Sequence, residues 1–147
     1  MHAIAFHAKT GRAHLPYLRR LLARAIQHIR YCPVDLSIAL VGDKRMAQLH
    51  EQFMHIPGPT DVLTFELDHD ARGRCVSGEI VVCVPYATRA AKRLRHEIRH
   101  ELLLYALHGV LHLSGYDDRT PTAYQRMHRR EDQILTLLGV GAVFKKN

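Results

Sequence analysis

Apolar residues recur along the chain with two periods, and the period predicts which segments form helices and which form strands. Over 15–29 the spacing is three or four residues, which is the period of one buried helix face. Over 36–41 large apolar residues alternate with other residues, as in a strand with at least one buried face. A short strand over 2–7 precedes these segments. After them we expect a helix that Asp43 caps and that ends before Pro57.

Two further apolar segments, 62–65 and 76–84, are predicted to be strands. The polar, glycine-containing stretch 68–74 between them is typical of a hairpin connection. From 86 to 113 the pattern is helical, in one piece or two, and the Ser-Gly pair at 114–115 ends it.

The last predicted helix begins at Thr120-Pro121 and is closed by Gly139. About four strands with helices at both ends of the chain predict an α+β fold, in which a mixed sheet is packed with helices. No repeat and no linker-like stretch interrupts the pattern, so we expect residues 1–147 to form a single domain.

Composition agrees with one soluble domain. The chain has 147 residues, of which 47% are hydrophobic, and this is enough apolar material for one core. It contains no signal-peptide pattern and no apolar run approaching the ~18 residues of a membrane span, so we expect a cytoplasmic protein without a membrane partner. The three cysteines include no CxxC pair, which argues against a disulfide framework and against a thiolate zinc site.

The charge balance favours a polyanionic partner. The formal net charge is +7 and the sequence pI is near 9.7, which suits contacts with phosphate groups. Part of this charge lies in the helical segment 86–113, and it either contacts the phosphate groups of such a partner or forms a solvated helix face. The candidate residues for these contacts are Arg89, Lys92, Arg93, Arg95 and Arg99.

A candidate metal site is encoded near the end of the same segment. His108 and His112 are four residues apart, so on a helix both imidazoles project from one face. Asp118 follows the helix-ending glycine and can fold back as a third ligand. The alternative is that both histidines are ordinary polar positions on a half-buried helix. His96 and His100 share the spacing without an obvious third ligand, and we interpret them as part of a solvated basic face.

The candidate site suits a metal that activates water, but the residue after His108 argues against a zinc peptidase. Three protein ligands leave one metal position open, which is typical of a zinc site that activates water. In the peptidase motif HExxH a glutamate follows the first histidine, whereas here that position is Gly109. A peptidase is therefore not expected.

Three stretches resemble the YbeY family of bacterial rRNA maturation factors. Residues 108–118, HGVLHLSGYDD, are similar to the family signature HGxLHLxGYDH; 59–65, PTDVLTF, is similar to PTDVLSF; and 78–82, GEIVV, resembles the GDI strand. The likeness covers roughly residues 35–138. It implies a four-stranded sheet surrounded by helices, one zinc ion held at the three signature positions, and single-stranded RNA as substrate. It also implies a role in 16S rRNA maturation and ribosome quality control on the small ribosomal subunit, with no DNA partner.

The chain departs from the family pattern at several positions. Asp118 replaces the usual third histidine, while Asp117 matches the family aspartate, so we expect Asp117 to shape the turn or support the ligands from outside. Met54 replaces an arginine thought to contact RNA, with His55 adjacent, and Leu104 replaces a frequent histidine. A carboxylate ligand hardens the site, so manganese, nickel or cobalt should compete somewhat better with zinc.

The combined expectation is a zinc-dependent, single-strand-specific endoribonuclease with one divalent metal per chain. Its general base is unidentified, and motif position offers only Thr64 and Glu79 as candidates for contacts in the active site. The alternative is a non-enzymatic assembly factor, in which the metal stabilises the turn at Gly115 and the basic face binds rRNA.

Overall fold

A mixed four-stranded sheet forms the centre of the protein. The computed structural model describes residues 2–143. Its strands are β1 (Ala3–Ala8), β2 (Asp35–Val41), β3 (Val62–His69) and β4 (Cys75–Cys83), in the order β1-β2-β4-β3. β1, β2 and β4 are parallel, and β3 is antiparallel to β4. The predicted four-stranded mixed sheet and the β3–β4 hairpin are confirmed.

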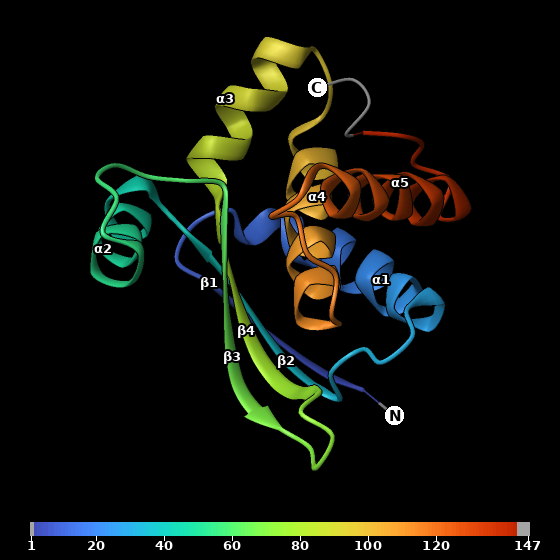
Figure 1. Ribbon diagram of the computed structural model, residues 1–147. Coiled ribbons are helices and arrows are strands. Elements are labelled where there is room, and N and C mark those ends of the chain that lie inside the picture. Colours follow the sequence, from blue (N-terminus) through green and yellow to red (C-terminus); the bar gives the residue numbers. More distant parts are fainter. Residues whose placement is uncertain (1, 144–147) are drawn as a thin grey trace.

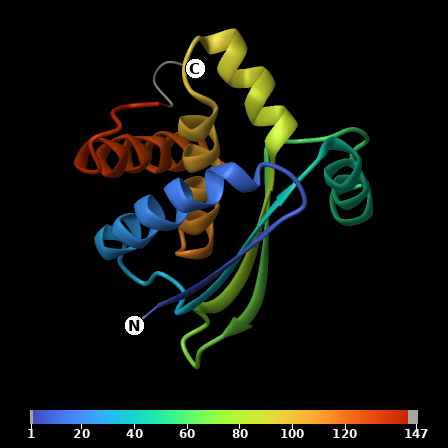
Figure 2. The same cartoon turned by 180° about the vertical axis from the view of Figure 1, so that it is seen from behind.

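Within the described residues, five α-helices surround the sheet. They are α1 (Leu15–Ala25), α2 (Asp43–Met54), α3 (Val84–Leu94), α4 (Ile98–Leu113) and α5 (Pro121–Leu137). Figure 1 shows α1, α4 and α5 on one side of the sheet, α2 on the other, and α3 extending beyond the end of β4. The view from behind shows the same layers (Figure 2). The helical pattern over 86–113 is divided in two at Arg95, whose φ of 59° lies in the left-handed region.

Helix α4 is the central helix of the helical layer. Eleven of its 16 residues are buried, because it packs between the sheet and helices α1 and α5. Its approach to β4 is close: a Cβ added to Gly109 would lie 2.7 Å from Ile80, and one added to Gly78 would lie 2.7 Å from Leu113. Glycine at these two positions therefore lets the end of α4 that carries the histidines rest directly on the sheet.

The sheet separates two cores. The larger core lies between the sheet and α1, α4 and α5. The smaller one lies on the opposite face beneath α2, and its buried members are Val41, Met46, Leu49, Leu63, Val81 and Cys83. Both cores share one sheet, so the described residues form one α+β domain, as predicted.

Most helix ends lie close to where the sequence placed them, but the first helix ends at Ala25 and not at residue 29. Ile26–His28 forms a short 3-10 helix, and Ile29 is already extended. Thr120 caps α5, since its side chain accepts a hydrogen bond of 3.1 Å from the Ala123 N–H. The prediction that Asp43 caps α2 was wrong. The cap residue is Gly42, and Asp43 lies in the first turn, where its carboxylate accepts two hydrogen bonds from Arg89 of α3. The tertiary partner thus determines the orientation of this side chain.

None of the helices within residues 2–143 combines the length and the apolar character needed to cross a membrane.

Candidate metal centre

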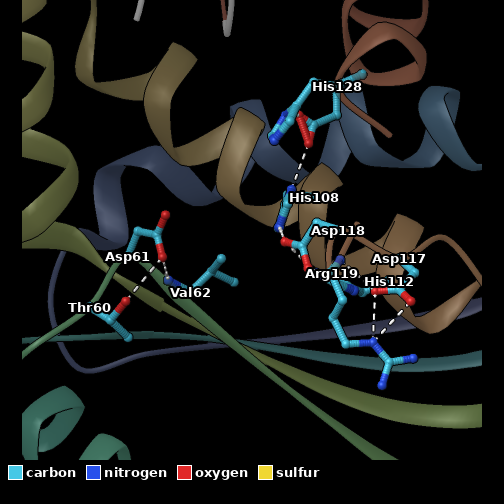
Figure 3. Close-up of polar contacts among 10 residues, drawn as sticks. Thr60, Asp61, Val62, His108, His112, Asp117, Asp118, Arg119 and His128 are labelled. Carbon is cyan, nitrogen blue, oxygen red and sulfur yellow. Dashed lines mark hydrogen bonds and ion pairs between the residues drawn. The ribbon is translucent and has the colours of Figure 1, made fainter. Parts of the chain in front are cut away.

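The end of α4 and the turn that follows it bring three donor side chains together. His108 and His112 lie one turn apart on α4, which ends at Leu113 and is followed by Ser114. Gly115 then takes a φ of 106°, a conformation that favours glycine, and the chain reverses. Asp118 is thereby turned toward both imidazoles (Figure 3).

The spacing of the donor atoms suits a divalent metal ion. Asp118 Oδ2 lies 3.3 Å from His112 Nε2 and 3.6 Å from His108 Nε2. One donor atom from each residue lies within 4.8 Å of the other two. Ligands around a tetrahedral zinc ion with bonds of ~2.0 Å are separated by ~3.3 Å. The residues therefore fit the metal that the sequence predicts; their role as ligands remains a prediction.

A buried carboxylate on α5 supports the same histidine from behind. Glu131 is fully buried, and its two oxygens lie 2.6 Å from His108 Nδ1 and 2.8 Å from His128 Nδ1. Neither Glu131 nor His128 was predicted from the sequence. One signal was available: Glu131 falls between Met127 and Ile134 on the buried stripe of α5, where an acidic residue needs a partner.

These contacts favour the charged forms of the groups involved. Burial opposes the charge on His108, but the hydrogen bond and the negative charge of Glu131 outweigh burial and raise the pKa of this imidazole. Burial likewise acts to raise the pKa of Glu131, yet the hydrogen bonds from His108 and His128 hold it below its usual range.

Asp117 binds Arg119 and is not among the donors grouped around the two histidines. Its Oδ1 accepts hydrogen bonds from the Arg119 backbone N–H at 2.9 Å and from Arg119 Nε at 3.1 Å. The backbone hydrogen bond is the main reason why the pKa of Asp117 is lowered. The structure thus brings Asp118, and not Asp117, to the two imidazoles.

The two candidates for further active-site contacts lie in different places. Thr64 lines an open hollow of about 480 Å³ together with His112. Glu79 is exposed and lies on the far face of the sheet, because the next residue, Ile80, meets Gly109 of α4 and side chains alternate along a strand. Only Thr64 is therefore placed beside the histidines.

The predicted basic stretch is only partly available for phosphate contacts. Arg89 binds Asp43 through two hydrogen bonds of 2.8 and 2.9 Å. Arg99 lies 3.1 Å from a Glu97 oxygen and packs over the ring of Tyr17. The other three residues are exposed, and they are Lys92, Arg93 and Arg95. RNA binding by this stretch remains a prediction.

The interpretation of His96 as part of a solvated basic face was wrong. Its side chain is only 7% exposed, and its Nε2 lies 2.6 Å from Oε1 of the buried Glu101. His100 is also partly covered, and its Nε2 lies 3.3 Å from Glu97. The carboxylates that pair with these rings become visible only in the structure, because the spacing of histidines along the chain does not show which side chains are buried beside them.

At two positions where the chain departs from the resembled family, the structure shows apolar side chains in different settings. Met54 ends α2 and is 54% exposed, whereas Leu104 is buried in the larger core. Neither supplies a polar group, and His55 beside Met54 is exposed.

The family model described as Endoribonuclease YbeY matches residues 7–139. The chain belongs to the YbeY family. Endoribonuclease YbeY of Thermobifida fusca (strain YX) is 37% identical over 126 residues, which cover 80% of this chain and 81% of the relative. The YbeY of Acidothermus cellulolyticus is 38% identical over 128 residues, with 78% of each chain covered. The chain spans 61% of the YbeY of Rhodococcus opacus (strain B4), with 38% identity.

The solution structure of TM1509 from Thermotoga maritima has a similar fold. It aligns with a TM-score of 0.63 and 25% identity, covering 92% of this YbeY-family chain and 91% of TM1509. The family expected from the signature stretches and the predicted fold class are thus both confirmed.

Proposed function

We propose that this chain is a zinc-dependent endoribonuclease that cuts single-stranded RNA. The observation that carries the proposal is the convergence of His108, His112 and Asp118 on one point at the surface end of α4, in a chain of the Endoribonuclease YbeY family. The substrate class rests on the family, and the site rests on the geometry of the chain itself.

The three side chains would hold the metal through His108 Nε2, His112 Nε2 and an Asp118 oxygen. When bound, a divalent metal with an open position polarises a phosphoryl oxygen and acidifies water. An open hollow that includes Thr64 adjoins one of the three donors, His112, and we propose it as the path by which a phosphodiester would approach. Thr64 can donate a hydrogen bond to a phosphate oxygen there, which would orient the backbone of the RNA.

Exposed cations elsewhere would attract the substrate without reading its sequence. The net charge of +7 favours a polyanion, and Lys92, Arg93 and Arg95 are exposed at the junction between α3 and α4. Contacts with phosphate groups depend on charge rather than on base identity. We therefore propose broad specificity for single strands.

In the cell we place this activity in the cytoplasm, in maturation of the 16S rRNA and quality control of the small ribosomal subunit. This assignment rests on membership of the YbeY family. Its test is the 16S rRNA of cells depleted of the protein: unprocessed ends should accumulate, and expression of the parent chain should restore normal processing.

The decisive test in vitro is cleavage of a labelled single-stranded RNA. We expect cleavage by metal-replete protein, none after chelation, and recovery on adding back zinc, with manganese as a second metal because Asp118 is a hard ligand. The same RNA annealed to its complement should resist cleavage. A His112→Ala variant purified in the same way is the control. Any cleavage by that preparation would come from contaminating nucleases.

The second candidate is an rRNA-binding assembly factor without catalytic activity. One observation favours it: the position of the family arginine is an exposed methionine, Met54. Metal-replete protein that binds single-stranded RNA but leaves it intact would support the assembly factor and exclude the endoribonuclease.

A further inference from the structure

We propose that Glu131 is the positioning residue of the metal centre: it fixes the ring orientation and the tautomer of His108, and His128 holds the carboxylate in place. This inference rests on the proposed metal centre. It assigns a function to a residue pair on α5, an element that contributes none of the three proposed ligands.

The geometry of the two imidazole rings fixes the nitrogen that carries the proton. Glu131 accepts from His108 Nδ1 at 2.6 Å and from His128 Nδ1 at 2.8 Å, one ring on each oxygen. An ionised carboxylate can only accept hydrogen bonds, so both Nδ1 atoms must carry a proton. A neutral His108 with its proton on Nδ1 has its lone pair on Nε2. That atom faces Asp118 at 3.6 Å, where the metal would lie.

The carboxylate of Glu131 is held rigidly in the protein interior. Glu131 has no exposed surface, so a carboxylate oxygen that lost its imidazole partner would have no water to replace it, and leaving a buried charge unpaired is costly. Its helix is fixed on both sides of it, because Met127 and Ile134 are fully buried in the larger core. The core packing of α5 therefore determines where His108 can point.

His128 holds the carboxylate of Glu131 in place. Its ring stacks on that of His108, with centroids 5.5 Å apart and planes 18° apart, and Tyr124 packs edge-on against it at 4.3 Å. His128 occupies the second oxygen of Glu131, which prevents the carboxylate from rotating away from His108. Figure 3 shows the imidazole of His128 on the side of His108 opposite to Asp118.

A second metal ion bound by His108, His128 and Glu131 is the alternative, since their donor atoms also lie within 4.8 Å of one another. The separations of 2.6 and 2.8 Å are those of charge-assisted N–H···O bonds. Ligands of one tetrahedral ion would be ~3.3 Å apart. The distances therefore favour hydrogen bonding over a second ion.

The primary test needs no variant. In metal-free parent protein, ¹⁵N NMR of the histidine rings should show His108 and His128 protonated at Nδ1 near neutral pH. A neutral His108 with its proton on Nε2 alone would overturn the proposal. Because this measurement needs neither metal nor RNA, it can fail or succeed independently of the proposed nuclease activity.

The second test is the affinity for zinc, measured by competition with a chelator of known affinity. Glu131→Gln should weaken binding roughly 10- to 100-fold, the range seen when an outer partner of a metal ligand is lost. His128→Phe keeps a stacking ring and should weaken binding less. Glu131→Asp keeps the charge and should recover part of the affinity.

Glu101→Gln is the matched control, because Glu101 is a fully buried carboxylate that pairs with a different histidine, His96, at 2.6 Å. We expect it to lower stability and to keep the parent affinity for zinc. Parent-like affinity in a folded Glu131→Gln variant would overturn the proposal. So would two zinc ions bound per parent chain, of which Glu131→Gln loses one.

Discussion

The carboxylates of Asp117 and Asp118 are neighbours in the chain but have different partners. Asp117 binds Arg119, while Asp118 faces His108 and His112. Asp118→Ala should therefore reduce zinc affinity by more than the roughly 10- to 100-fold expected for an outer partner, because it removes one of three donors. Asp117→Ala is the matched control and should keep the metal. Elemental analysis and chelator competition on both variants would measure this.

Asp118→His extends the same experiment by restoring three imidazoles. The variant should retain zinc and bind manganese less well than the parent, since imidazole is the softer ligand. Metal retention in Asp118→Ala with loss in Asp117→Ala would show that the wrong carboxylate was chosen.

Two buried thiols allow a prediction about pH. Burial raises the pKa of Cys32 and of Cys83 to about 11. At pH 8 only roughly 0.1% of each thiol would be thiolate, so reaction with a disulfide reagent should be slow in the folded protein and fast in denaturant. A raised folded-state pKa means that the associated stability is present below the unfolded pKa and is lost as the pH rises toward 11.

The measurement is the rate of thiol labelling against pH in folded protein, with Cys32→Ala and Cys83→Ala identifying each site. Rapid labelling of Cys83 at pH 8 without denaturant would contradict its burial. These cysteines are buried members of the core, in keeping with the absence of any CxxC pair in the sequence.

At the residue scale, sequence revealed the site only where its members are close in the chain. The spacing of His108 and His112 and the glycine turn to Asp118 are local features, and they predicted the cluster that the structure forms. Glu131 lies 23 residues from His108, so its contact depends on how α5 packs on α4. The prediction of a solvated His96 was wrong for a similar reason. Its partner Glu101 is buried by tertiary packing, which the local sequence does not show.

Among the secondary-structure elements, α3 and the start of α4 carry the predicted RNA-binding charge. Arg89 and Arg99 already pair with Asp43 and Glu97, so we expect most of the contribution from the three exposed cations. A Lys92→Ala/Arg93→Ala/Arg95→Ala variant should bind single-stranded RNA more weakly. Its slope of log K against log salt should fall by up to about 2, at ~0.7 per phosphate contact.

The control variant removes equal charge from exposed positions on α1 and α5, and it is Arg20→Ala/Arg24→Ala/Arg129→Ala. Binding is measured across a salt series by fluorescence anisotropy. If both triple variants lose the same affinity, only net charge matters; if neither does, the α3–α4 face is a solvated surface.

Element types followed from periodicity, whereas partners across elements did not. Alternation over 36–41 and the glycine-containing connection 68–74 correctly predicted β2 and the hairpin. The cap of α2 was wrong because the bidentate contact between Asp43 and Arg89 spans 46 residues. That contact also holds the pKa of Asp43 below its usual range, chiefly through the hydrogen bonds from Arg89.

For the whole molecule, the strand order β1-β2-β4-β3 was beyond what local patterns contain, since neighbours in a sheet are chosen by long-range packing. What the order achieves is clear in the structure. β4 lies inside the sheet, and its Gly78 and Ile80 receive Leu113 and Gly109 of α4. The proposed metal centre is therefore supported by the sheet on one side and by α5 on the other.

This arrangement predicts that metal binding stabilises the entire domain. The proposed ligands lie on α4 and the turn after it, and Glu131 links His108 to α5, so unfolding of the larger core would dismantle the site. A ligand that binds only the folded state adds about 2.7 kcal/mol at one hundred times its Kd. For a chain of this size that corresponds to roughly 5 to 10 °C in Tm.

Calorimetry of metal-free protein with and without zinc should show this rise, and Asp118→Ala should abolish most of it. An unchanged Tm at saturating zinc, with metal bound, would mean that the unfolded chain binds zinc as tightly as the folded one, and the three donors would then not form a site built by the fold.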